Sequence, residues 1–216
     1  MALLLKKGEC FLHIPKTGGS WVSAILKQQG LIKKEIGYHK HIDWTRVSYF
    51  PQSHTKLLSK INFSFSKFFY PKKSFCFVRH PLKWYESWWK YCSQDSVRWK
   101  VFGSNKCWHP NYFLHTCKSY DFNEFVRKVF DSRPGFVSEM YSQYAHNEIN
   151  FVGKQENLAD DLIYFLMQQE YSIKIEDIQK SPRQNVSVAQ KIKWDPQLRE
   201  EVKDSEKMAL LRYDYS

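Results

Sequence analysis

The amino-acid sequence predicts an α/β fold in which a central, mostly parallel β-sheet is flanked by helices. Short apolar runs typical of buried strands are followed by segments whose apolar residues recur at helical spacing. Strands that alternate with helices favour a parallel sheet. The chain has 216 residues, 43% of them hydrophobic, which is enough for a sizeable core. We therefore expect a single domain over residues 1–216.

The first strand and helix occupy residues 10–29. Cys10 to Ile14 is a short apolar run, and His13 within it is interpreted as a core or supporting residue. Residues 20–29 have the apolar spacing of a helix, and Gly30 stands where a helix C-cap belongs. A lysine, a threonine and two glycines separate the strand from the helix.

The second strand and helix follow the same order. Residues 74–78 form an apolar run that ends at Arg79, and Pro81 suits the first turn of a helix. An aromatic stripe runs along this helix, and we interpret it as core packing in preference to a base-stacking surface. Its members are Trp84, Tyr85, Trp88, Trp89 and Cys92.

The remaining elements are read from caps and periodicity. Residues 94–118 lack periodicity and predict a long loop or insertion. Asp121 and Glu124 form a capping box before an amphipathic helix, and Asp195 precedes a final helix that begins at Pro196. A third strand is expected within 149–156, and a helix over 157–169.

Net charge narrows the classes of partner. The formal charge of +11 favours binding of anions, whether nucleic acid, acidic membranes, polyanionic sugars or phosphorylated cofactors. No zinc-finger spacing, RNP motif or basic zipper is present, so nucleic acid is not the expected partner. No signal peptide and no run of roughly 20 apolar residues is found, which predicts no transmembrane segment and a cytoplasmic location. A chain whose anchor had been removed would look the same.

Five cysteines are present, without a CxxC pair. Cys92, Cys107 and Cys117 bracket the irregular segment, so a disulfide there stays open, although reduced thiols are the default in a cytosol. The sequence has no convincing metal-ligand spacing, and we expect no metal.

The segment "HIPKTGGSW", residues 13–21, predicts an anion site. Gly18 and Gly19 permit close approach of an anion, and the amides from Gly18 to Trp21 fall at a helix start, where unpaired N–H groups favour negative charge. Lys16 adds a charge, and Thr17 and Ser20 add hydroxyl groups. The alternative to an anion site is a purely structural glycine turn beside a surface lysine. The layout predicts a P-loop-like, three-layer fold, but lysine precedes the glycines here, unlike the Walker order, which disfavours Mg²⁺-dependent ATP hydrolysis.

Two motifs together resemble the PAPS-dependent sulfotransferases, in particular their carbohydrate branch. "HIPKTGGSW" is similar to the loop that binds the 5′-phosphosulfate. "FVRHPLKWYESWW" is similar to the motif that binds the 3′-phosphate through an arginine and a serine, here Arg79 and Ser87. "FVGKQENLADDL" and the C-terminal tail are weaker, structural similarities. His80 departs from the family, which often has an acidic residue after the arginine.

The resemblance implies transfer of a sulfuryl group from PAPS to an acceptor hydroxyl, expected on a carbohydrate, with release of PAP. Lys16 is then catalytic, and Thr17, Gly18, Gly19, Ser20 and Trp21 bind the donor with it. The late stretch "SPRQNVS" suggests a further nucleotide contact from Arg183. The general base is expected in "GYHKHIDW", residues 37–44, where His41 is favoured over His39. Glu35, just before this segment, is a weaker candidate for the base. His109 and His115 in the long loop could face the acceptor.

Two other functions stay open from the sequence. A P-loop-like kinase of a small molecule would require Mg²⁺-dependent ATP binding. A non-catalytic polyanion-binding protein would bind polymers in a salt-sensitive manner without any nucleotide. The ordered pair of loop and Arg79/Ser87 motifs disfavours the binder, because simple charge attraction requires neither.

Overall fold

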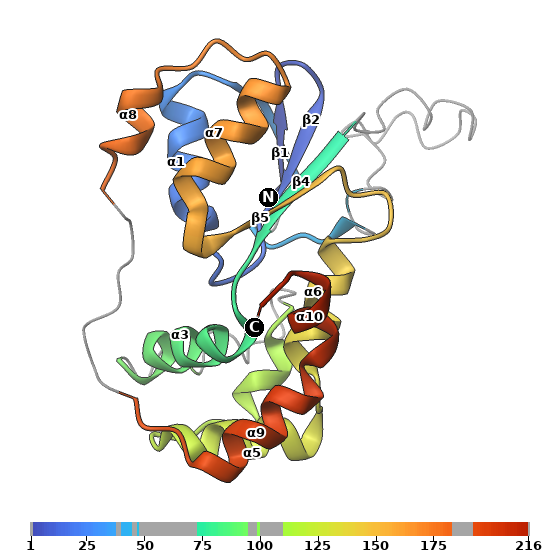
Figure 1. The fold of residues 1–216 in the computed structure, drawn as a ribbon, viewed down its shortest axis with the longest axis vertical. Helices are drawn as coiled ribbons and strands as arrows, with labels where there is room; N and C mark the ends of the chain where they lie inside the picture. Colours follow the sequence, from blue (N-terminus) through green and yellow to red (C-terminus); the bar gives the residue numbers. More distant parts are fainter. Residues whose placement is uncertain are drawn as a thin grey trace, which may run out of the picture.

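A computed structural model describes residues 2–37, 40–44, 47, 73–94, 99, 110–182 and 192–215. Their core is a five-stranded mixed sheet with the order β3-β1-β2-β4-β5 (Figure 1). The strands are β1 (Ala2–Leu5), β2 (Glu9–Leu12), β3 (Ile32–Ile36), β4 (Lys73–Val78) and β5 (Phe151–Lys154). The expected α/β class is confirmed.

The centre of the sheet is parallel, and one side is antiparallel. β2 pairs with β4 and β4 with β5 in parallel, whereas β1 is antiparallel to both β2 and β3. The three strands expected from apolar runs are β2, β4 and β5. β1 and β3 were not predicted, and they make the sheet mixed. The N-terminal apolar run is therefore a strand, joined to β2 by a turn at Gly8, whose φ is 108°.

The helices agree with the sequence at most predicted positions. They are α1 (Gly19–Gln28), α3 (Pro81–Ser93), α5 (Phe122–Ser132), α6 (Phe136–Tyr144), α7 (Leu158–Gln168), α8 (Ile175–Gln179), α9 (Pro196–Ser205) and α10 (Lys207–Arg212), with 3-10 turns η2 (Tyr112–His115) and η3 (Gln155–Asn157). The predicted N-caps are confirmed, since the carboxylates of Asp121 and Asp195 accept the N–H groups of Glu124 and Leu198, both at 2.8 Å. The capping box lacks its return bond, because the Asp121 N–H donates to the Ser119 hydroxyl at 3.0 Å. α6 and α8 were not predicted, and η2 shows that the expected long loop contains a helical turn.

Alternate residues on the central strands build two cores on opposite faces of the sheet. Phe11, Phe75 and Phe77 pack with residues of α1 and α7. Leu12, Cys76 and Val78 pack with residues of α3, α5, α6, α9 and α10. Figure 1 shows the corresponding division, with α1, α7 and α8 beside the sheet and the other helices gathered in the opposite half. This alternation follows from the two-residue period of a strand.

The aromatic stripe on α3 belongs to the second core. Its five members are between 0% and 5% exposed, and the rings of Trp84 and Trp88 stack with centroids 5.7 Å apart. The interpretation as core packing is confirmed.

The structure tests two expectations, a possible disulfide among Cys92, Cys107 and Cys117 and the absence of a transmembrane segment, only for the residues that it describes. Cys92 and Cys117 are buried and form no disulfide with each other, while Cys107 lies outside the described residues. Within the described ranges, none of the helices is both long and apolar enough to cross a bilayer.

A buried carboxylate joins three helices and divides the predicted final helix into α9 and α10. Glu206, 0% exposed, accepts hydrogen bonds from the Tyr85 hydroxyl at 2.7 Å and from the N–H groups of Val137 and Ser138 at 3.0 and 2.7 Å. These N–H groups lie in the first turn of α6, where a negative charge is favoured. Burial, and next the charge of Glu206, raises the pKa of Tyr85 well above its ordinary value, so the hydroxyl stays a donor.

We expect Glu206→Ala to lower the free energy of unfolding by about 3 kcal/mol, because buried donors on α3 and α6 lose their acceptor. Urea unfolding measures this loss. Glu200→Ala removes an exposed carboxylate from the adjoining helix α9 and should change stability by less than about 0.5 kcal/mol. Equal losses in the two variants would contradict the role of Glu206.

Candidate functional site

Parallel pairing of β2 with β4 brings two chain segments to one edge of the sheet. Leu12, the last residue of β2, pairs with Cys76, two residues before β4 ends at Val78, and α1 and α3 begin beyond the two strands. The crevice at the carboxyl ends of parallel strands is the usual ligand site of an open α/β sheet. The indole N–H of Trp84 on α3 donates to the Pro15 carbonyl at 2.8 Å and fixes the loop after β2 against the helix after β4.

The loop backbone is shaped for close approach. Lys16 and Gly18 both have left-handed backbones, with φ of 65° and 86°, and Gly18 caps α1 without any side-chain hydrogen bond. A Cβ on Gly19 would lie 2.1 Å from the imidazole ring of His13 beneath it. Glycine is therefore required at position 19, and His13 is a buried supporting residue, as expected.

Two of the predicted donor contacts are already used inside the loop. The Thr17 hydroxyl donates to the Ile14 carbonyl at 3.0 Å and is buried, so it braces the turn. The Trp21 N–H donates to the Gly18 carbonyl at 3.0 Å, so an anion would compete with that bond. The helix start at Gly19 and Ser20 is where an anion would meet the dipole of α1, whose first turn carries no acidic residue.

Lys16 and Arg79, far apart in sequence, lie together. The Arg79 Nη1 group donates to the Lys16 carbonyl at 3.4 Å, and the Lys16 amine lies over the Tyr91 ring, 4.3 Å from its centroid. Arg79 Nε is buried and has no hydrogen-bond partner among the described residues. Burial lowers the pKa of Arg79 from its ordinary value. An anion that accepted from this guanidinium would satisfy a donor that the folded chain leaves unpaired.

Ser87 lies on α3, which starts directly after Arg79 and His80. It comes six residues after Pro81, about 9 Å along the helix at 1.5 Å per residue. Only 7% of the residue is exposed. The helix therefore relates Ser87 to Arg79 rigidly.

His41 is brought to the same loop from a different part of the chain. Its Nδ1 atom lies 2.9 Å from the His13 carbonyl, and the two imidazole centroids are 4.6 Å apart. Since a carbonyl only accepts, Nδ1 carries the proton, and Nε2 is the basic nitrogen of the neutral ring. The Tyr144 hydroxyl donates to the His41 carbonyl at 2.5 Å and holds the backbone. His39, His109 and Arg183 lie outside the described residues.

The other histidine and acid candidates lie elsewhere. Glu35 is on β3, an outer strand of the sheet on the side away from β4. His115 ends η2, and its Nδ1 contacts the Tyr112 carbonyl of the same turn at 2.6 Å. Neither has a described contact with the loop.

Several residues near the site were not singled out by the sequence. Lys40 donates from Nζ to the Ser20 hydroxyl at 2.7 Å. Glu156 accepts the His80 N–H at 3.0 Å and the Tyr215 hydroxyl at 2.9 Å, which fixes the C-terminal tail beside Arg79. The sequence offers one signal for Lys40, which is its place between the two candidate histidines. The contact between Glu156 and Tyr215 joins residues 59 positions apart, so no local pattern could predict it.

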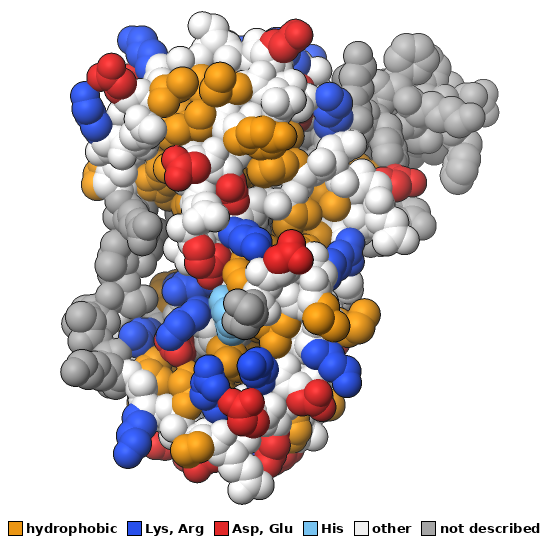
Figure 2. Space-filling model, viewed as in Figure 1, with side chains coloured by type: hydrophobic (Ala, Val, Ile, Leu, Met, Phe, Trp, Pro, Cys, Tyr) orange, Lys and Arg blue, Asp and Glu red, His pale blue; other side chains and the backbone are white. Residues whose placement is uncertain are grey.

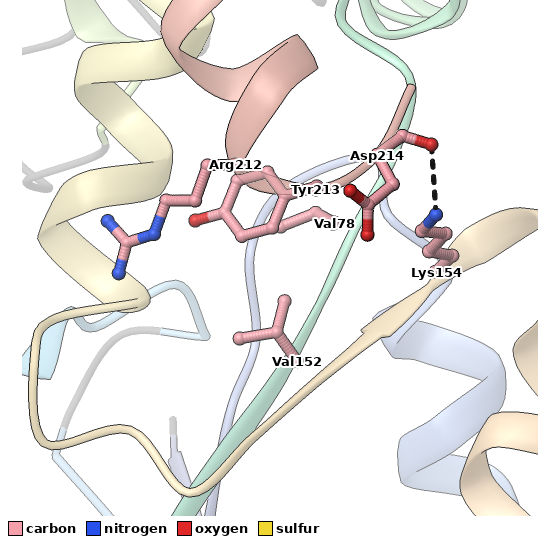
Figure 3. A pocket seen from close by; sticks show the side chains of 6 residues that line it. All are labelled: Val78, Val152, Lys154, Arg212, Tyr213 and Asp214. Carbon is pink, nitrogen blue, oxygen red and sulfur yellow. Dashed lines mark hydrogen bonds between the residues drawn. The ribbon is translucent and has the colours of Figure 1, made fainter. Parts of the chain in front are cut away.

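A shallow cleft of about 280 Å³ opens on the β5 side of Arg79 (Figure 3). The lining side chains come from the ends of β4 and β5 and from the C-terminal tail: Val78, Val152, Lys154, Arg212, Tyr213 and Asp214. The Lys154 amine donates to the Asp214 carbonyl at 3.2 Å across it. The residues predicted to bind the donor do not line this cleft.

The role of His80 explains its departure from the sulfotransferase pattern. His80 is the N-cap of α3, and its Nδ1 accepts the Leu82 N–H at 3.2 Å. An acidic residue at this position could accept the same hydrogen bond. Burial lowers the pKa of His80, Glu156 opposes that shift, and Lys83 adds to it, so the neutral, accepting ring is favoured.

This cap predicts a pH-dependent stability. Above the ordinary histidine pKa near 6.5, both folded and unfolded states are neutral; as the pH falls through it, the unfolded chain takes up a proton that the folded chain resists. The free energy of unfolding should therefore fall between pH 7 and pH 5.5. Denaturant titrations should show a smaller fall in His80→Asn, which caps without titrating, and a residual fall from His146, whose pKa is also lowered by burial. An unchanged pH profile in His80→Asn would contradict this account.

Groups of three or more His, Cys, Asp or Glu side chains that could hold a metal ion are not found among the described residues. Comparison of the chain with protein-family models, with curated proteins and with solved structures finds no match.

Proposed function

We propose that the protein is a PAPS-dependent sulfotransferase of the carbohydrate type, with a P-loop-like, three-layer fold. The observation that carries this proposal is the 3.4 Å contact between the Arg79 guanidinium and the Lys16 carbonyl. It places side by side the two motifs that resemble the 5′- and 3′-phosphate sites. Both motifs follow neighbouring parallel strands, so one ligand at this edge of the sheet could contact both.

The residues at this edge fit a doubly phosphorylated nucleotide. Gly19 lets the His13 ring pack directly against the loop, and the first turn of α1 has no acidic side chain to repel an anion. The buried, unpartnered Nε of Arg79 offers a planar donor suited to a phosphate. Ser87, on the helix that starts directly after Arg79 and His80, is the second residue proposed for the 3′-phosphate.

PAPS supplies the sulfuryl group as a substrate. In the proposed reaction His41 Nε2 takes the proton of the acceptor hydroxyl, and the hydroxyl oxygen forms a bond to sulfur. The bond from sulfur to the bridging phosphate oxygen breaks, and its electron pair stays on the phosphate of PAP. Lys16 and the amides of the loop stabilise the charge that develops there.

The acceptor class follows from charge and chemistry together. A neutral histidine base suits an alcohol, and sugars provide hydroxyl groups in an exposed form. Figure 2 shows many Lys and Arg side chains across the middle and lower part of one face, in keeping with the net charge of +11. Such a surface favours an acceptor that carries negative charge, such as an acidic polysaccharide.

We expect PAP to bind with a micromolar or smaller dissociation constant, and Arg79→Ala to weaken binding by about 2 kcal/mol or more through loss of charged hydrogen bonds. Isothermal titration calorimetry measures both. Arg199→Ala removes an exposed arginine on α9 and serves as the control. Equal affinity in Arg79→Ala and the control would remove the 3′-phosphate assignment.

His41→Ala should lower kcat by about 100-fold or more, because the acceptor proton loses its base. Its affinity for PAP should remain that of the wild type, since the imidazole is assigned to the acceptor and not to the nucleotide. A sulfate-transfer assay and calorimetry test the two statements. Full turnover in this variant would move the base elsewhere, and His39 would then be the next residue to replace.

A further inference from the structure

We propose that Lys40 is a second cation, beside Lys16, for the 5′-phosphosulfate end of the donor. This inference rests on the proposed function, and it adds a charged residue that the motif resemblance does not include. The Lys40 amine lies 2.7 Å from the Ser20 hydroxyl, which belongs to the second residue of α1.

The position of this lysine is unfavourable unless an anion binds. The N-terminus of a helix carries partial positive charge, and a cation there costs free energy where an acidic residue would gain it. α1 has no acidic residue in its first turn and no side-chain cap, yet a lysine amine is fixed to that turn. Within the described part of the chain, no carboxylate forms an ion pair with Lys40.

Lys40 and Lys16 reach the loop from different elements. The Lys16 amine lies against the Tyr91 ring, on the α3 side, whereas Lys40 is held on the α1 side by Ser20. A phosphosulfate has negative charge on both its phosphate and its sulfuryl oxygens. Two amines from different elements can therefore contact both groups at once.

The same turn supplies Lys40 and the proposed base. Lys40 directly precedes His41, whose backbone is held by Tyr144 and whose ring is held by the His13 carbonyl. The contacts that fix His41 therefore also fix the origin of the Lys40 side chain. Partial burial lowers the pKa of Lys40 from its ordinary value, as expected for an amine drawn toward the protein without a counter-charge.

The test compares two nucleotides that differ only at the 5′ end. Calorimetry on the full chain would measure PAP and adenosine 3′-monophosphate binding to the wild type, Lys40→Met and Lys40→Arg. Lys33→Met, an exposed lysine on β3, is the control. We expect Lys40→Met to weaken PAP binding about tenfold or more and to leave adenosine 3′-monophosphate unchanged, because only PAP has a 5′-phosphate. Lys40→Arg should retain most of the PAP affinity, and Lys33→Met should retain all of it.

Three results would overturn the assignment or its premise, and they are distinguishable. Wild-type affinity of Lys40→Met for PAP would exclude Lys40 from the 5′ site. Equal weakening of both nucleotides would show a general structural role in place of a contact with the 5′ end. A wild-type protein that binds neither nucleotide would refute the proposed function itself.

Discussion

The parallel pairing of β2 with β4 is the constraint on which the candidate site depends. Because Leu12 and Cys76 are partners, the strands end within two residues of each other, and the chain leaves both toward the same edge. The loop with Lys16 and the segment with Arg79 therefore both lie at this edge of the sheet. The bond from the Trp84 indole to the Pro15 carbonyl holds the loop against α3, and the bond from Arg79 to the Lys16 carbonyl joins the two segments directly.

Helix α3 has two structural roles, and its aromatic residues divide between them. Trp84 packs in the core and also holds the loop, whereas Tyr85 donates to Glu206 and connects the helix with α6 and the C-terminal region. Glu206 is satisfied by donors from two elements, so its buried charge fixes their relative position. The site is thereby built on a helix that the rest of the second core holds rigidly.

Local signals in the sequence predicted local structure well. The capping carboxylates of Asp121 and Asp195, the strand before Pro15 and the glycine turn all depend on neighbouring residues, and the structure contains each of them. β3 was missed because its pattern, IKKEI, has few apolar residues and alternates at an edge. The Lys40–Ser20 contact depends on how the chain returns to the loop, and no local pattern records that. The family resemblance stays a prediction, since the contacts support its geometry without testing its chemistry.

The left-handed backbone of Lys16 has a thermodynamic consequence. A non-glycine residue with φ of 65° carries strain of about 1 kcal/mol, and the Arg79 guanidinium contacts the carbonyl of that same residue. A ligand that draws Arg79 away removes this contact and changes what holds the turn. The conformation of the turn after β2 and the position of the guanidinium after β4 are therefore linked energetically.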